Sequence, residues 1–443
     1  EDKMGRPQGF KAFTIVWAGQ VFSLIGTAMS GFALGIWAWQ TTESATALAL
    51  MGFFGFIPVV IFGPFTGALV DRWNRKLVMM FSDLANGVTT LIILLLYLSG
   101  DLQIWHIYVV AFFAGIFQSF QWPAYSAAIS LMVPKEQYTR ASGMISLAES
   151  GSGILAPIFA GALLAATNLT SILVIDLITL SIAITALLVV VVPQPRETSE
   201  GQEGKGNLLH EAAYGFRYIF ARPSLLGLQL VFFFGNLFGS FGFTVLGPMV
   251  LARSGNNPNF LAWTESAMGV GGVLGGLAIT AWGGPKKRVH GVLAGFALSG
   301  LFTVILGAGR SLPFWLVGGF LSSMVVVLIN SSNQAIWQAK VSPDVQGRVF
   351  SARRLIAQVA APVSMLLAGP LADQIMSPGL LTADAPLSAS LGWAAGIGPG
   401  AGMGLMIAAS GVLSLLVGLL GYAFPKVRNA EALLPDHEGL VKE

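Results

Sequence analysis

The chain has 443 residues, of which 54% are hydrophobic and 10% are charged, so a water-soluble globular protein, with about 25% charged residues, is excluded. The same figures exclude a disordered chain, and the complete lack of cysteine excludes disulfides and cysteine-based metal or redox sites. The net charge of +3 comes from basic residues beside apolar stretches, so the expected partner is a lipid bilayer and not nucleic acid.

Twelve apolar stretches follow one another along the chain, separated by polar joints. A bilayer core about 30 Å thick needs about 20 apolar residues per helix, and each stretch is long enough. The sequence therefore predicts an all-α membrane protein. The predicted spans are 11–40, 46–70, 77–98, 105–133, 140–165, 171–192, 224–252, 262–282, 289–308, 312–338, 348–375 and 402–424.

The basic residues predict how these spans are oriented. When alternate joints are assigned to one face, 22 of the 24 lysines and arginines lie on that face, and only Arg253 and Arg310 lie on the other. Positively charged joints stay in the cytoplasm. We therefore expect a multi-pass protein of the cell membrane with both termini in the cytoplasm.

The longest predicted cytoplasmic joint divides the spans into two groups of six. We expect an N-terminal six-helix bundle at 1–192, a linker at 193–223, a C-terminal six-helix bundle at 224–424 and a cytoplasmic tail at 425–443. Apolar residues at helical spacing over 208–221 predict an amphipathic helix in the linker. Two joints, 133–140 and 341–348, begin with Val, contain a Pro and an acid and end with Arg, which indicates a duplication. Two such halves around a mid-membrane site are typical of transporters.

The joint between the second and third spans reads Gly-Ala-Leu-Val-Asp-Arg-Trp-Asn-Arg-Lys at 67–76. It fits G-x-L-x-D-R-x-x-R-K at every specified position, and so resembles the loop 2-3 signature of the major facilitator superfamily. The resemblance implies twelve helices in two pseudo-symmetric six-helix bundles that work by alternating access. Residues 23–76, and the entry to the seventh span at 210–223, further resemble the macrolide-efflux branch of the drug:proton antiporters. That branch implies drug export against an inward flow of protons.

The resemblance also implies a gate latch at the cytoplasmic side. Asp71 would dock against the start of the eleventh span, near Arg348, when that side is closed. Gly67 would let the second span approach a neighbour closely, and Arg72 and Arg75 would anchor the turn among the lipid headgroups. The alternative is that the basic residues only anchor the loop, which leaves Asp71 without a role.

Charged groups at membrane depth are costly unless they are paired or neutralised, so each is a candidate functional residue. Glu149 lies about nine residues beyond Arg140, roughly 13 to 15 Å into the membrane, and is the first candidate for proton coupling. The alternative is a glutamate that bonds to neighbouring helices. Asp83, around 10 Å deep, is the second candidate; otherwise it braces the cytoplasmic gate with Asn86. Three further carboxyl groups are expected near the outer rim: Asp176, Glu265 and Asp373.

Uncharged polar residues at membrane depth indicate a substrate cavity. On the first span, four of them recur at i, i+3, i+7 and i+10 and share one face, which we expect to look into the central cavity. Hydrogen bonds between packed helices are the alternative for each. The cavity candidates are Gln20, Ser23, Thr27, Ser30, Gln118, Gln121, Asn236, Asn330 and Asn333.

Enzymatic chemistry has no support in the sequence. There is no Ser-His-Asp set, histidine cluster or phosphate-binding loop, so we expect no enzyme, no cofactor and no metal. The first hypothesis is a monomeric secondary transporter that exports amphipathic or lipophilic small molecules by proton-coupled alternating access, and the sequence does not distinguish H⁺ from Na⁺ as the coupling ion. The alternatives are a lysophospholipid or other lipid flippase of the same superfamily, and a non-transporting membrane receptor or binding protein.

Overall fold

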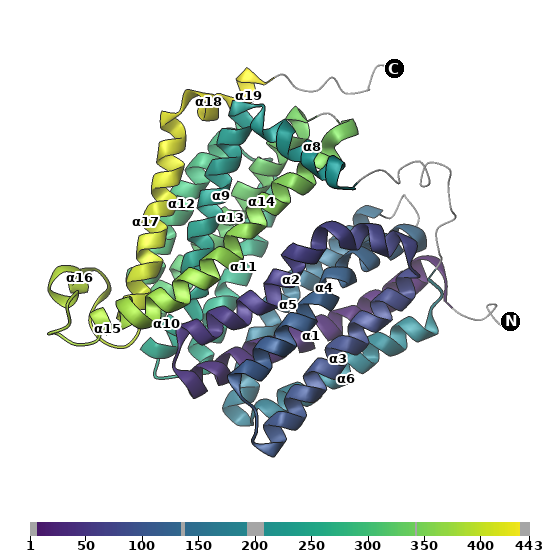
Figure 1. The fold of residues 1–443 in the computed structure, drawn as a ribbon, viewed down its shortest axis with the longest axis horizontal. Coiled ribbons are helices and arrows are strands. Elements are labelled where there is room, and N and C mark those ends of the chain that lie inside the picture. The colour runs from purple at the N-terminus through teal and green to yellow at the C-terminus, as the bar shows by residue number, and fades with distance from the viewer. Residues whose placement is uncertain (1–6, 134–137, 193–207, 342, 435–443) are drawn as a thin grey trace. The chain divides into compact units, whose positions relative to one another are not determined.

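The computed structural model describes residues 7–133, 138–192, 208–341 and 343–434, and every regular element in these ranges is a helix (Figure 1). The long helices are α1 (Gly9–Thr42), α2 (Ala45–Arg72), α3 (Arg75–Ser99), α4 (Ile104–Met132), α5 (Tyr138–Ala166), α6 (Leu169–Val189), α9 (Pro223–Thr244), α11 (Pro258–Trp282), α12 (Arg288–Ala308), α13 (Leu312–Lys340), α14 (Pro343–Leu371) and α17 (Ala401–Ala423). The shorter ones are α8 (Leu208–Phe220), α10 (Leu246–Arg253), α15 (Ser377–Gly379), α16 (Ser388–Ala395), α18 (Pro425–Arg428) and α19 (Ala430–Leu433).

The predicted spans all coincide with long helices or helix pairs. Eleven segments of the described chain are long and apolar enough to cross a membrane. The remaining span is α11, which has 25 residues but contains several glycines and Glu265, and these lower its hydropathy. The predicted all-α membrane fold is confirmed.

Two spans contain breaks that the hydropathy pattern did not predict. In the seventh span, α9 ends at Thr244 and α10 begins at Leu246. Pro248 has no N–H to donate to the carbonyl of Thr244, so a continuous helix would lack this bond. In the eleventh span, α14 is followed by a π-helical turn over Ala372–Met376.

Short polar side chains begin several of the helices. The side chains of Ser44, Asn74 and Asn168 each accept a hydrogen bond from the backbone N–H three residues later, at 3.2, 3.3 and 3.4 Å. Such caps satisfy an N–H group that has no partner inside the helix. Asn74 lies in the motif at 67–76, so this motif also fixes where α3 starts.

The described helices form two compact units. The first comprises Glu1–Glu197 with Asn257–Ser266, and the second comprises Thr198–Asn256 with Ala267–Glu443. Within the first unit, α1 is bonded to several neighbours through side chains. Trp17 donates to the carbonyl of Met144 on α5 at 2.9 Å, while Gln20 and Thr27 reach α3 and α6. Because α1 holds these helices together, changes at its polar residues act on the whole unit.

In the second unit, glycines bring α12 and α17 together. A Cβ atom on Gly300 would lie 2.4 Å from the carbonyl oxygen of Gly411, so the two backbones are in direct contact there. At one end of this pair, Arg253 donates to the carbonyls of Gly309 and Ala395, and Arg310 donates to that of Trp393. The two basic residues assigned to the outer face therefore hold backbone carbonyls.

Candidate functional site

A buried carboxyl group joins three helices of the first unit. Asp83 on α3 is 2% exposed. Its Oδ2 accepts a hydrogen bond from Nε2 of Gln20 on α1, and its Oδ1 accepts one from Nε2 of Gln121 on α4, both at 2.9 Å. The sequence analysis suggested Asn86 as the residue that acts with Asp83, whereas in the structure the hydrogen-bond partners are the two glutamines. Because all three side chains come from different helices, the charge of Asp83 bears directly on how α1, α3 and α4 pack.

The charge of Asp83 has no counter-ion among the described residues. Within the described residues its side-chain partners are the two amides, and no lysine or arginine acts on it. An ionised carboxylate without a cation costs several kcal/mol to bury, of which two amide hydrogen bonds offset only part. Binding a proton would remove this charge.

The site also contains an acceptor without a donor. The Oε1 atom of Gln121 is buried and has no hydrogen-bond partner among the described residues. The two ends of a side-chain amide are assigned from the hydrogen-bond pattern. If this amide turns over, Oε1 comes to the place of Nε2, beside Oδ1 of Asp83, where it can accept a hydrogen from a protonated carboxyl group. The arrangement thus suits both the ionised and the protonated aspartate.

Asp176 is not a rim residue, and the expectation from the sequence is wrong. This aspartate of α6 is 1% exposed. Thr27 on α1 donates to its Oδ1 at 3.0 Å, and Thr90 on α3 donates to its Oδ2 at 2.9 Å. The expectation for Asp176 came from counting residues from the end of the span. This count gives the depth of a residue along the helix, but it does not give the direction of its side chain.

Glu149, in contrast, is exposed on α5 and has no hydrogen bond in the described part of the chain. Its charge acts on Tyr125 of α4, whose hydroxyl group is buried without a partner. Glu149 is therefore an exposed carboxyl group within a predicted span, whereas Asp83 is buried.

The other cavity candidates fall into exposed and buried groups. Gln118 and Asn330 are exposed, whereas Ser23 and Ser30 are buried. Asn236 donates to the carbonyl of Phe232 in its own helix at 2.8 Å. Asn333 is fully buried and accepts a hydrogen bond from Trp337 at 3.1 Å. For Gln20, Thr27 and Gln121 the structure shows hydrogen bonds between helices of one unit.

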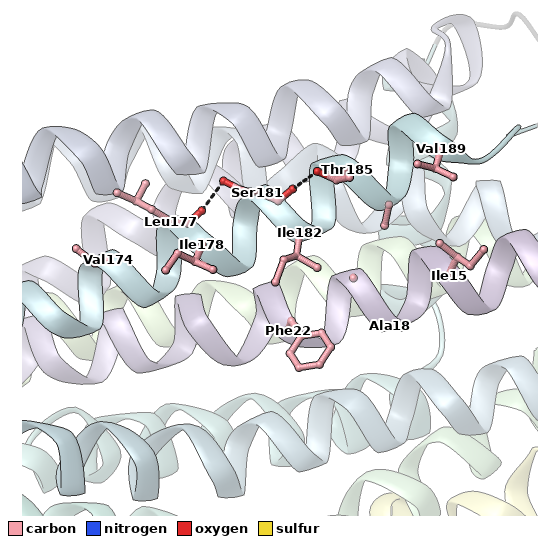
Figure 2. A pocket seen from close by; sticks show the side chains of 12 residues that line it. Ile15, Ala18, Phe22, Val174, Leu177, Ile178, Ser181, Ile182, Thr185 and Val189 are labelled. Atoms are coloured by element: carbon pink, nitrogen blue, oxygen red, sulfur yellow. Dashed lines mark hydrogen bonds between the residues drawn. The ribbon is translucent and has the colours of Figure 1, made fainter.

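An apolar groove of about 780 Å³ runs between α1 and α6 (Figure 2). Phe22, Ile178 and Ile182 line it. Its two hydroxyl groups, of Ser181 and Thr185, donate to carbonyls of their own helix at 2.7 Å, so they offer no hydrogen to a ligand. A second groove of about 630 Å³ between α3 and α4 is also apolar and includes Phe81. Both suit hydrocarbon rather than polar ligands.

Comparison with known proteins establishes the family. The family model described as Major Facilitator Superfamily matches residues 16–365. The chain belongs to the major facilitator superfamily. Macrolide efflux protein A of Streptococcus pyogenes is 29% identical over 368 residues, which cover 82% of this chain and 90% of that protein. The multidrug efflux pump Tap of Mycolicibacterium fortuitum is 25% identical, over 79% of this chain and 87% of the pump.

Solved structures of major facilitator proteins share the fold. A bacterial homolog of the human lysosomal transporter Spinster superposes with a TM-score of 0.68 at 14% identity, covering 95% of this chain and 98% of that one. A POT family transporter in complex with 5-aminolevulinic acid has a TM-score of 0.68 at 11% identity, covering 93% and 95%. At these identities the likeness concerns the fold. The chain is a multi-pass membrane transporter of this superfamily.

Of the residues expected in the latch, only Arg75 has a described side chain, and it is buried. Asp71 and Arg72 end α2, and Arg348 lies in the first turns of α14. The side chains of these three residues, and Gly67, fall outside the described part. The latch of this major facilitator protein therefore stays a proposal that rests on its motif.

Replacing Asp71→Asn should open the cytoplasmic side of this transporter. Loss of an ion pair worth about 1 kcal/mol shifts a two-state population about fivefold. The chain has no cysteine, so pairs of introduced cysteines at the cytoplasmic ends of α2 and α14 carry spin labels at defined places. The expected result is a larger fraction of long distances. Asp384→Asn, in the exposed segment before α16, is the matched control. Identical distance distributions in all three proteins would discard the latch.

Proposed function

We propose that this transporter exports lipophilic or amphipathic small molecules in exchange for protons. The observation that carries the proton part is Asp83, a buried carboxyl group with two amide partners and no counter-ion in the described chain. The substrate class is supported by the macrolide and multidrug efflux relatives and by the apolar grooves. We place the protein in the cell membrane as a monomer with both termini in the cytoplasm, as its basic joints indicate.

The two carboxyl groups have separate tasks in this proposal. Asp83 binds the coupled proton, and its change of charge alters the hydrogen bonds that hold α1, α3 and α4 together. A hydrogen bond to a charged group is worth about 1.5 to 3 kcal/mol, which is enough to shift an equilibrium between two states at least tenfold. Pro123 lies two residues beyond Gln121, inside α4. Since proline removes a helical hydrogen bond, α4 can bend there most easily.

Glu149 faces the substrate in this proposal. An exposed carboxylate in a membrane transporter attracts a cationic group of an amphipathic molecule, while the apolar part of the molecule binds apolar side chains. An ion pair between Glu149 and the cation holds this cargo in the same unit as Asp83. The exposed polar residues Gln118 and Asn330 are further candidates for contacts with cargo.

Transport into proteoliposomes tests the proposal. Purified protein is reconstituted with a pH-sensitive dye inside the vesicles, and an imposed pH gradient drives uptake of a macrolide or a lipophilic cation. We expect uptake that follows the gradient, proton movement that depends on added substrate, and loss of both with a protonophore. Uptake that ignores the pH gradient would contradict proton exchange.

Lipid transport is the second candidate, and the groove between α1 and α6 favours it (Figure 2). Its lining of aliphatic side chains and Phe22 has room for an acyl chain. The same vesicles, loaded with a fluorescent lysophospholipid, distinguish the two functions. Movement of the lipid between leaflets without uptake of macrolide or cation would replace drug export by lipid flipping.

A further inference from the structure

Asp176 forms a second buried polar centre that proton exchange at Asp83 does not use. Its carboxylate lies between three helices: Thr27 of α1 donates to Oδ1 at 3.0 Å, and Thr90 of α3 donates to Oδ2 at 2.9 Å. Thr27 lies seven positions after Gln20 on α1, and Thr90 lies seven positions after Asp83 on α3. Seven residues of helix rise about 10.5 Å, so the two centres are separate.

A third hydroxyl group at this centre has no hydrogen bond of ordinary geometry in the described chain. Ser30 of α1 is 5% exposed, and its Oγ is buried without a hydrogen bond in the described chain. The same Oγ lies close enough to Asp176 to act on its carboxylate. One carboxylate and three hydroxyl groups therefore converge, and one of the hydroxyl groups is aimed into the centre without a bond of ordinary geometry. Burying a hydroxyl group without a good hydrogen bond is unfavourable, so a ligand that binds the Ser30 oxygen would stabilise the centre.

The charge of this centre is also uncompensated. The neighbours that act on Asp176 are the three hydroxyl groups, and no basic residue of the described chain is among them. Asp83 differs, because amide N–H groups approach it and an N–H hydrogen repels a cation. The three side chains that act on Asp176 each present a hydroxyl oxygen with lone pairs. Hard cations such as the alkali and alkaline-earth ions prefer oxygen ligands of this kind.

When the hydroxyl oxygens bind a cation, their hydrogens can be donated to backbone carbonyl groups instead. In this chain, Thr41 and Thr185 donate to the carbonyl four residues earlier in their own helices, at 2.8 and 2.7 Å. Thr27 and Thr90 lie on helices and can turn their hydrogens in the same way. The oxygen lone pairs then point at the ion.

The single carboxylate sets the charge of the ion. A monovalent cation leaves the buried centre neutral, whereas a divalent one leaves a net positive charge in a buried place.

The packing of the helices sets the size of the ion that the centre can bind. A Cβ atom on Gly26 would lie 3.2 Å from Oδ1 of Asp176 and 2.1 Å from Oγ1 of Thr179, so α1 and α6 are in close contact beside the carboxylate, which favours a small ion. Thr27 is exposed and leaves one side of the centre accessible.

We propose that Asp176, Thr27, Thr90 and Ser30 form a binding site for a small monovalent cation, with Na⁺ as the expected occupant. The two carboxylate oxygens and three hydroxyl oxygens supply its ligands. The ion neutralises Asp176, gives Ser30 a partner and ties α1, α3 and α6 together. The site is independent of proton exchange at Asp83, and it modifies the expectation from the sequence that the chain binds no metal.

Thermal unfolding of the purified full-length protein tests the site without any transport. A ligand that binds only the folded state raises the melting temperature in a saturable way. We expect NaCl to raise it above choline chloride at equal ionic strength, KCl to raise it less because K⁺ is larger, and MgCl₂ to act no differently from choline. Binding of radioactive ²²Na⁺ should saturate near one ion per chain.

Substitutions assign the effect to these residues. Ser30→Ala removes one ligand from a buried position and should weaken the apparent Na⁺ affinity about tenfold or more, with the melting temperature in choline chloride little changed. Asp176→Asn should abolish the Na⁺ response. Ser152→Ala is the matched control, since this buried serine of α5 lies in the same unit and donates to the carbonyl of Leu24.

Two results would overturn the proposal: equal melting temperatures in sodium and choline, or a sodium response that Ser30→Ala and Asp176→Asn leave unchanged. If Asp176→Asn does not fold, Ser30→Ala alone decides. A negative result leaves proton exchange untouched, because the transport assay can be run in sodium-free buffer, where it tests Asp83 alone.

Discussion

Asp83→Asn is expected to stop proton-driven export while the protein still folds and binds substrate. Asparagine has the shape of aspartate and can keep hydrogen bonds to Gln20 and Gln121, because side-chain amides donate and accept. It cannot bind or release a proton. Uptake driven by a pH gradient should fall at least about tenfold, a change that corresponds to ~1.4 kcal/mol. Substrate binding, measured by tryptophan fluorescence or thermal shift, should stay within a factor of about two.

The control for this experiment is Asp101→Asn. Asp101 is an exposed aspartate in the loop after α3, so this variant changes the net charge of the chain equally without touching the buried centre. Full pH-driven uptake in Asp83→Asn would exclude Asp83 as the proton site. Gln121→Leu offers an independent check, since it removes one amide bond and should alter the pH at which uptake is half-maximal rather than abolish uptake.

Glu149→Gln should weaken the binding and export of cationic substrates. Glu149 is exposed and has no hydrogen-bond partner in the described chain, so its carboxylate can pair with a cationic substrate. In detergent solution, Glu149→Gln should bind a lipophilic cation at least about tenfold more weakly than the parent. Uptake of a neutral macrolide should change much less than uptake of a cation, because a neutral molecule makes no ion pair.

Glu43→Gln is the matched control for Glu149, because Glu43 is an exposed glutamate at the end of α1. The two carboxyl groups are distinguished by their substrates: Asp83→Asn should impair export of neutral and cationic molecules alike, and Glu149→Gln chiefly that of cations. If Glu149→Gln binds and exports a cation as well as the parent does, Glu149 has no part in recognising cargo.

Several features of the fold follow directly from the sequence. Spans separated by polar joints can be recognised because the bilayer demands about 20 apolar residues for each crossing, and each predicted span falls on a long helix or helix pair. The motif at 67–76 was sufficient for the superfamily, which the family model confirms. The break at Val245 was missed, although the Gly-Pro pair that follows it is visible in the sequence and disfavours a continuous helix.

The partners of the buried carboxyl groups were decided only by the tertiary structure. Asp83 finds its amides 63 and 38 positions away, and Asp176 lies 149 positions from Thr27. Counting residues along a span gives the depth of a side chain in the membrane. It does not give the rotation of the helix about its axis, which depends on packing against neighbours such as Gly26. For this reason the positions of the helices and the family could be predicted from the sequence. Only the packing of the helices shows which carboxyl groups are buried and which side chains surround them.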